Sequence, residues 1–227
     1  MTGGPRSATD VRGGGVPTPH GYRFELTGGA LCLDFANTLD ERPTMSPREL
    51  LPDYRHLVDW SRQAGALTAS ACRRLLTETA AEPGQARAVV RRARALREII
   101  FEVFAARARD VPVPQEALHR LNLELRASFA HIGVARVGAR FCWDWDGGPA
   151  PDRMLWPVAR SAAELLTSEQ LDRVRVCAAA DCDWLFLDRS KNRSRRWCDM
   201  RVCGNRSKVR QYRAAARGAL RGIRPRR

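Results

Sequence analysis

Lysine is almost absent from this chain of 227 residues, because 37 of its 39 basic side chains are arginines. Such a bias is typical of a GC-rich genome and says little about function. Long apolar runs are missing as well: the richest stretch, residues 99–104, contains a carboxylate, whereas a membrane span needs about 18 consecutive apolar residues. Residues 1–21 contain six glycines and three prolines but no apolar stretch, which argues against a secretory signal. We therefore expect a soluble, cytoplasmic protein with no membrane partner.

Catalytic motifs are also missing. The sequence contains no His-x-Glu zinc signature, no Gly-rich phosphate loop and no nucleophile elbow. Its four histidines, His20, His56, His119 and His131, are scattered and fit surface or packing roles better than catalysis. We therefore do not expect an enzyme.

Positive charge is in excess, and the excess is confined to one end of the chain. The formal net charge is +14. Residues 173–227 carry 17 basic and four acidic side chains, a balance of +13, whereas the other 172 residues carry 22 basic and 21 acidic ones, a balance of +1. Codon bias does not explain this segregation. It indicates a polyanionic partner for the C-terminal quarter of the chain.

The hydrophobic pattern predicts one mostly helical domain over residues 22–170, after a flexible leader at residues 1–21. Helices are expected after the capping residues Asp53 and Thr68. Further helical patterns cover about 85–109, 114–130 and 151–166, and residues 31–39 fit either a strand or a helix. Between residues 134 and 145 the pattern changes to an alternation of apolar and polar residues, which predicts a β-hairpin. The predicted fold class is mostly α with a small β-hairpin.

The cysteines fall into two groups. Three of the seven stand 40 and 70 residues apart on apolar faces, as buried thiols often do. The other four form two pairs, Cys177-x4-Cys182 and Cys198-x4-Cys203, with fifteen residues between the pairs. This spacing can place four thiolates around one Zn²⁺, and a coordination sphere filled by protein makes the metal structural. Two disulfides are the alternative, which a chain without a secretion signal disfavours.

Basic residues follow each half of this cysteine pattern. Five of the eight residues 189–196 are basic, and residues 204–227 contain nine basic and no acidic side chains. From Arg206 the arginines recur every three or four residues, which puts them on one face of a helix. We therefore predict a four-cysteine zinc module at 171–215, a hairpin followed by a basic helix, and a basic tail at 216–227. The candidate nucleic-acid-binding residues are Arg189, Lys191, Arg193, Arg195, Arg196, Arg206, Lys208, Arg210, Arg213 and Arg217.

Several segments together resemble a known family. Residues 177–188 (CAAADCDWLFLD), 190–192 (SKN), 195–200 (RRWCDM) and 203–206 (CGNR) closely resemble the CGNR zinc finger. Upstream, residues 33–38 (LDFANT) and 96–98 (LRE) resemble the ABATE domain that usually accompanies it. The resemblance implies a bacterial, stress-related transcription regulator with zinc held by the four cysteines. It assigns no chemical role to Asn37.

Two side chains of the helical domain are candidates for a ligand pocket. Asp34 and Asn37 are polar residues within an apolar segment, although capping or a buried hydrogen bond would also explain them. A domain of this kind could sense a small-molecule effector or self-associate, and a homodimer would suit paired DNA half-sites.

The leading hypothesis is a DNA-binding transcription regulator. The basic charge fits RNA or a ribosome as well, because phosphate contacts alone do not distinguish the two nucleic acids. A protein-interaction zinc module and an enzyme are further alternatives.

Overall fold

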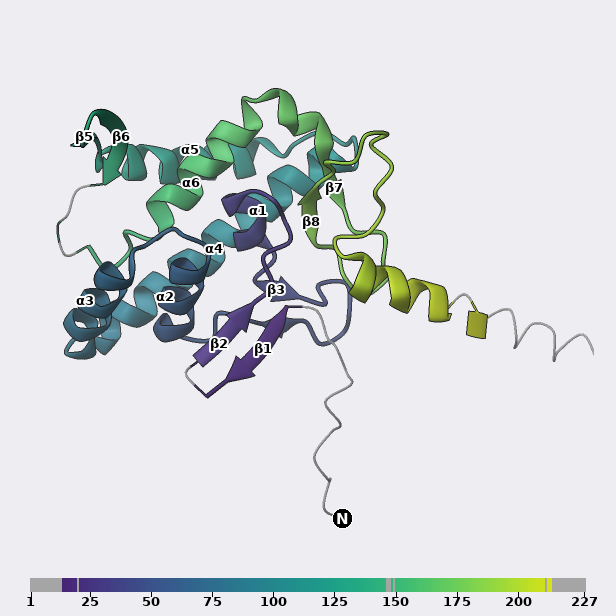
Figure 1. Ribbon diagram of the computed structural model, residues 1–227, viewed down its shortest axis with the longest axis horizontal. Coiled ribbons are helices and arrows are strands. Elements are labelled where there is room, and N and C mark those ends of the chain that lie inside the picture. Colours follow the sequence, from purple (N-terminus) through teal and green to yellow (C-terminus); the bar gives the residue numbers. More distant parts are fainter. Residues whose placement is uncertain (1–13, 20, 146–147, 149, 211, 214–227) are drawn as a thin grey trace, which may run out of the picture.

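A computed structural model describes residues 14–19, 21–145, 148, 150–210 and 212–213 (Figure 1). The predicted tail at 216–227 and most of the predicted leader lie outside these residues. The end of the leader is ordered as a strand, which corrects the prediction: β1 (Gly15–Thr18) pairs antiparallel with β2 (Gly21–Phe24). A Cβ on Gly15 would lie 2.1 Å from the carbonyl oxygen of Arg23, so glycine permits the close pairing of these strands.

The long helix α4 (Pro83–Ala108) forms the centre of the helical domain. It contacts α1 (Leu31–Ala36), α2 (Tyr54–Gln63), α3 (Ala69–Ala80), α5 (Gln115–Phe129) and α6 (Leu155–Leu166). Figure 1 shows α2 and α3 near one end of α4 and the strands β7 (Val174–Val176) and β8 (Leu185–Leu187) near the other. The mostly helical fold class is therefore confirmed.

Local signals predict the helix starts well in two places. The side chain of Asp53 accepts a hydrogen bond from the His56 N–H, and that of Thr68 accepts one from the Ala71 N–H. Both predicted caps are confirmed. Residues 31–39 divide between α1 and the short strand β3 (Leu39–Asp40), which pairs with β4 (Arg48–Glu49). The ambiguous pattern of this segment thus reflects a real change from helix to strand.

The predicted hairpin is present as β5 (Ile132–Val137) and β6 (Arg140–Trp145). A single 3₁₀ turn (Glu169–Arg173) then leads from α6 into β7 (Val174–Val176), which pairs with β8 (Leu185–Leu187). The chain ends, as far as it is described, with a π-helical turn (Met200–Gly204) and helical residues 205–210 and 212–213. In Figure 1 this last helix projects away from the helical domain.

Strand β8 belongs to two hydrophobic cores at once. Leu185 and Leu187 pack into the core of the helical domain, together with Val174 of β7. Phe186, between them, points to the opposite side and packs with the four C-terminal cysteines. Because alternate side chains of a strand face opposite ways, one three-residue strand joins the two cores. The boundary between residues 170 and 171 therefore separates sequence motifs but not hydrophobic cores.

Every helix in the described part of the chain is too short or too polar to cross a lipid bilayer.

Candidate metal centre and basic surface

The four C-terminal cysteines come together as a buried cluster. Their sulfur atoms all lie within 4.8 Å of one another, and the Cys182–Cys198 and Cys198–Cys203 pairs are each 3.6 Å apart. Four sulfurs bound tetrahedrally at about 2.3 Å from zinc would stand about 3.8 Å apart. The spacing fits a Zn²⁺ ion and is too long for the S–S bond of about 2.05 Å in a disulfide.

Hydrogen bonds to sulfur stabilise negative charge in this cluster. The Cys198 N–H lies 3.4 Å from the Cys177 sulfur, and the Arg206 guanidinium lies 3.4 Å from the Cys203 sulfur. Contacts among the four thiols lower the pKa of Cys177 and Cys203 and raise the pKa of Cys182 and Cys198, so the first protons are lost from Cys177 and Cys203. The four sulfur donors are therefore suited to a metal cation, and they leave no open coordination position for a substrate.

A small aromatic core supports the cysteines. Trp184 and Phe186 are buried among them, and Trp197 packs at the edge. The indole N–H of Trp197 donates to the Ser207 hydroxyl at 3.1 Å, which ties the loop to the last helix. So short a module depends on its metal and this core together.

The basic loop 189–196 is held by one buried carboxylate. Asp188 accepts hydrogen bonds from the N–H and hydroxyl of Ser190, at 2.9 and 2.6 Å, and from the Arg195 N–H at 2.9 Å. Burial opposes the charge on Asp188, but these bonds outweigh it and lower the pKa of the carboxyl. The loop thus has a defined shape before any partner binds.

Four of the predicted nucleic-acid-binding residues are engaged within the protein. Arg189 donates to the Gly29 carbonyl at 2.9 Å. The Arg195 guanidinium lies over the Phe186 ring and donates to the backbone carbonyls of Trp197 and Cys198. Arg206 and Arg210 both pair with the carboxylate of Asp181. All four cations thus make structural contacts, and the partners of Arg189, Arg206 and Arg210 are distant in sequence.

The other predicted cations face solvent. None of them pairs with a carboxylate among the residues that the structure describes, and Arg196 only lies over the Trp197 ring, at 5.4 Å. Arg201 is also exposed. It was not predicted from the sequence, because it lies between Cys198 and Cys203 and outside the two basic runs. Arg217 falls outside the described residues. The solvent-facing set, called the finger cations below, is Lys191, Arg193, Arg196, Lys208 and Arg213.

Two family models match the chain in consecutive segments. Residues 29–169 match ABATE, described as "Putative stress-induced transcription regulator", and residues 173–216 match the CGNR zinc finger. The chain belongs to the ABATE family. No curated protein matches it. The finger match and the sulfur geometry agree that Cys177, Cys182, Cys198 and Cys203 hold one structural zinc ion.

Asn37 of the ABATE domain makes two hydrogen bonds to the zinc finger. Its side-chain amide donates to the Leu185 carbonyl at 2.9 Å and accepts from the Leu185 N–H at 2.8 Å. The amide thus pairs with strand β8 as a neighbouring strand would. Both polar atoms of Asn37 are used, which favours the second explanation given above, a buried hydrogen bond, over a ligand pocket.

Asp34 also points inward. One carboxylate oxygen accepts from the Gly28 N–H at 2.7 Å, and burial raises the pKa of this carboxyl to about 6. Asp34 is not part of the cavity described below, whose lining comes from α2, α3 and α4 and the segment before α2. The structure therefore offers a role for Asp34 in the fold of the loop before α1.

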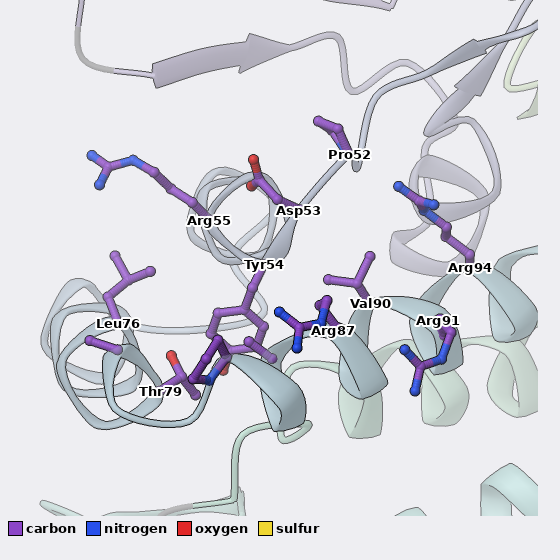
Figure 2. A pocket seen from close by; sticks show the side chains of 13 residues that line it. Pro52, Asp53, Tyr54, Arg55, Leu76, Thr79, Arg87, Val90, Arg91 and Arg94 are labelled. Carbon is purple, nitrogen blue, oxygen red and sulfur yellow. The ribbon is translucent and has the colours of Figure 1, made fainter.

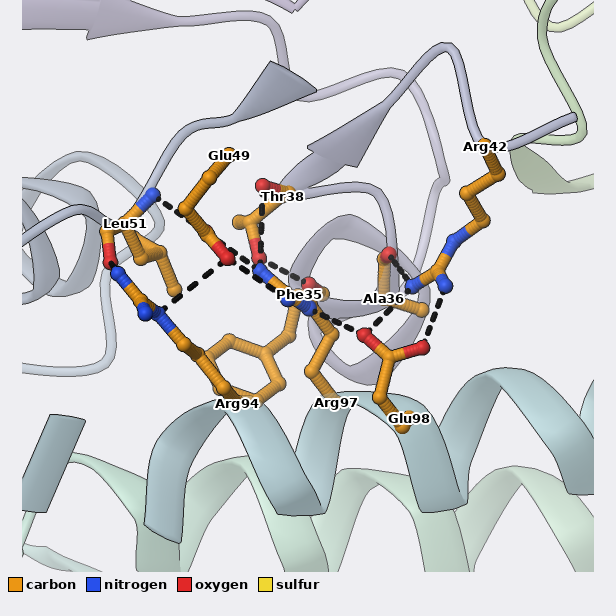
Figure 3. Close-up of polar contacts among 9 residues, drawn as sticks. All are labelled: Phe35, Ala36, Thr38, Arg42, Glu49, Leu51, Arg94, Arg97 and Glu98. Atoms are coloured by element: carbon orange, nitrogen blue, oxygen red, sulfur yellow. Dashed lines mark hydrogen bonds and ion pairs between the residues drawn. The ribbon is translucent and has the colours of Figure 1, made fainter. Parts of the chain in front are cut away.

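A network of ion pairs joins α4 to the chain between α1 and α2 (Figure 3). Arg97, buried on α4, binds both oxygens of Glu49, at 2.6 and 2.9 Å, and one oxygen of Glu98 at 2.8 Å. Arg42 donates to the other Glu98 oxygen, and Arg94 pairs with Glu49 at 3.3 Å. The resemblance identified residues 96–98 as a motif, and the structure shows that Arg97 and Glu98 belong to this network while Leu96 is buried in the hydrophobic core.

Proposed function

We propose that the protein is a DNA-binding transcription regulator whose zinc finger holds the finger cations against the phosphate backbone. One observation carries the proposal: these five cations are exposed and lack carboxylate partners within the described chain. Cations free of internal partners keep their full charge for an external polyanion. The filled zinc sphere supports a binding role without catalysis.

The zinc ion would set the geometry of this surface. Cys198 and Cys203 hold the last helix, which carries Lys208 and Arg213. Asp188 holds the loop with Lys191 and Arg193. Loop and helix are linked by the Trp197–Ser207 hydrogen bond, so both halves of the cationic surface rest on one small scaffold.

The family description supports a stress-related transcription regulator. A bacterial origin and a cytoplasmic site of action are parts of the proposal that the description does not mention. Phosphate contacts alone supply affinity without sequence preference, so recognition of an operator requires at least one side chain to reach a base edge. In this proposal the ABATE domain senses an effector or self-associates.

The direct test is retention of random genomic fragments by the zinc-loaded protein, at several salt concentrations. We expect one zinc per chain, binding that weakens steeply with salt, and repeated recovery of a common fragment. Removing zinc with a chelator should abolish retention, and adding zinc back should restore it. A zinc-loaded protein that retains no DNA at low salt would contradict the proposal.

A parallel titration with RNA of the same sequence distinguishes the main alternative. Tighter binding to RNA than to DNA would replace the DNA-binding proposal with an RNA-binding one, because use of the 2′-hydroxyl or base stacking separates the two ligands.

A further inference from the structure

A cavity of about 580 Å³ lies between α2, α3 and the first half of α4 (Figure 2). This volume falls within the roughly 300–1,000 Å³ typical of small-molecule sites. Leu76, Ala86 and Val90 give it an apolar wall, and the Tyr54 ring lies between the α3 side and the α4 side. It lies at the end of α4 away from the zinc finger.

The polar atoms inside this wall already have partners. The Tyr54 hydroxyl donates to the Pro151 carbonyl at 2.7 Å, and the Thr79 hydroxyl donates to the Leu75 carbonyl at 2.6 Å. Neither hydroxyl therefore has a hydrogen left to donate to a ligand. The interior suits an apolar body.

The rim of the cavity carries positive charge. Arg87, Arg91 and Arg94 follow one face of α4 at steps of four and three. Arg94 donates to the Leu51 carbonyl at 3.1 and 2.8 Å and is thereby fixed. Arg87 and Arg91 are exposed, with no ion pair to any residue that the structure describes.

The cavity lining carries little negative charge, and the carboxylate concerned already has a hydrogen-bonding partner within the protein. Among the described residues that line the cavity, Asp53 is the one carboxylate, and it accepts from the His56 N–H at 2.9 Å and contacts the His56 ring nitrogen at 2.8 Å. Arg55 also belongs to the lining, but Figure 2 shows its guanidinium extending away from Tyr54. The electrostatic field of Arg87 and Arg91 is thus left for a ligand.

We propose that this cavity binds a small amphipathic anion, a monocarboxylate with an aromatic or short aliphatic body. The body packs against Tyr54, Leu76 and Val90, and the carboxylate pairs with Arg87 and Arg91. Guanidinium groups bind carboxylates through paired N–H donors, which favours a carboxylate over a neutral group of the same shape.

The cavity is connected to the zinc finger by contacts already described. Arg94 pairs with Glu49, which Arg97 binds in turn, and Arg97 donates to the Thr38 carbonyl at 3.4 Å. Thr38 follows Asn37, whose amide is bonded to Leu185 of β8. An effector role for the anion rests on the DNA-binding function proposed above, whereas binding of the anion does not.

Isothermal titration of the full-length, zinc-loaded protein with phenylacetate and with octanoate tests the site. We expect saturable binding of at least one of the two, and binding of phenylacetamide, the neutral counterpart of phenylacetate, at least about tenfold weaker. Arg87→Gln/Arg91→Gln should weaken carboxylate binding by about tenfold or more. Ala86→Trp, which fills the cavity, should abolish it.

Arg126→Gln/Arg140→Gln is the matched control, because it removes two exposed charges far from the cavity and should leave binding unchanged. Far-UV circular dichroism confirms that each variant is folded. The proposal is overturned if neither carboxylate binds, if phenylacetamide binds as well as phenylacetate, or if the Arg87/Arg91 variant binds like the wild type. If the carboxylate binds without changing DNA affinity, the site stands and its effector role is overturned.

Discussion

The arginines of the helical domain and the cations of the zinc finger face different surroundings. Arg97 has a side chain only 4% exposed between Glu49 and Glu98, and Arg92 is shared by Glu124 and Asp152. In the finger, Asp181 pairs with two arginines, while the finger cations have no carboxylate partner within the described chain. The comparison teaches that each cation's role depends on its surroundings: a buried, paired arginine such as Arg97 stabilises the fold, whereas the exposed finger cations keep their charge available to a polyanion.

Loss of a zinc ligand should break the finger side of this comparison most severely. Cys198→Ser leaves three thiolates, and structural zinc contributes an apparent 10–16 kcal/mol or so in zinc-finger peptides. We expect loss of bound zinc and of the near-ultraviolet signal of Trp184. Metal analysis and circular dichroism check this outcome. Cys142→Ser, at an exposed cysteine outside the cluster, should keep its zinc.

Removing the buried guanidinium of Arg97 should damage the helical side instead. Arg97→Met leaves Glu49 and Glu98 with one arginine each, and breaking a buried pair on one side costs about 3–5 kcal/mol. Urea unfolding should show this loss, while Arg126→Met on the surface should shift the midpoint little. A stability of Arg97→Met equal to that of the wild type would contradict the structural role.

Asn37 links the two regions, so its loss should uncouple them. Asn37→Ala removes two hydrogen bonds and leaves the N–H and carbonyl of Leu185 without partners, at a cost of about 2–4 kcal/mol. Amide hydrogen exchange should rise at Leu185 before it rises in α4, with zinc still bound. Unchanged protection of Leu185 would show that the amide contributes nothing to β8.

Asp34 sharpens the comparison as a half-buried carboxyl that pairs with no arginine among the residues that the structure describes. Because burial raises its pKa to about 6 in the folded protein, the folded state keeps a proton that the unfolded chain releases near pH 4. Stability should therefore fall as the pH rises from about 4 to 6, by about 1–3 kcal/mol in total. Asp34→Asn should lack this fall. Chemical unfolding at pH 4.5 and 7 measures it, and parallel changes in both proteins would contradict the assignment.

Local signals were predictable from the sequence because each depends on neighbours in the chain. Asp53 and Thr68 bond to N–H groups three residues ahead, and the cysteine pairs bracket short turns. Glycine content was less informative. Residues 15–21 have the composition of a flexible segment, yet Gly15 and Gly21 adopt φ values of 123° and 136° that shape a hairpin.

Long-range contacts could not be predicted in the same way. Asn37 meets Leu185 across 148 positions, and no local pattern marks an amide that substitutes for a strand. The arginine spacing after Cys203 predicts a uniform cationic face, but Asp181 lies opposite Arg206 and Arg210 and pairs with both. Charge spacing identified the basic helix, and only the fold showed which cations remain free.

The central claim is that the unpaired cations of the finger, and not the arginines of the helical domain, bind the phosphate backbone. Fluorescence anisotropy of a labelled DNA duplex at 50, 100 and 200 mM salt or so tests it, with two variants of equal charge change. The finger variant is Lys191→Gln/Arg193→Gln/Lys208→Gln/Arg213→Gln. The control, at exposed arginines of the helical domain, is Arg73→Gln/Arg126→Gln/Arg136→Gln/Arg140→Gln.

We expect the finger variant to bind DNA more weakly than the wild type. The slope of log affinity against log salt concentration should be less steep by about 3 to 4, because each lost phosphate contact changes it by about 0.9. The control should keep nearly the slope of the wild type. Equal losses of slope in the two variants would contradict the claim, because binding would then follow net charge alone.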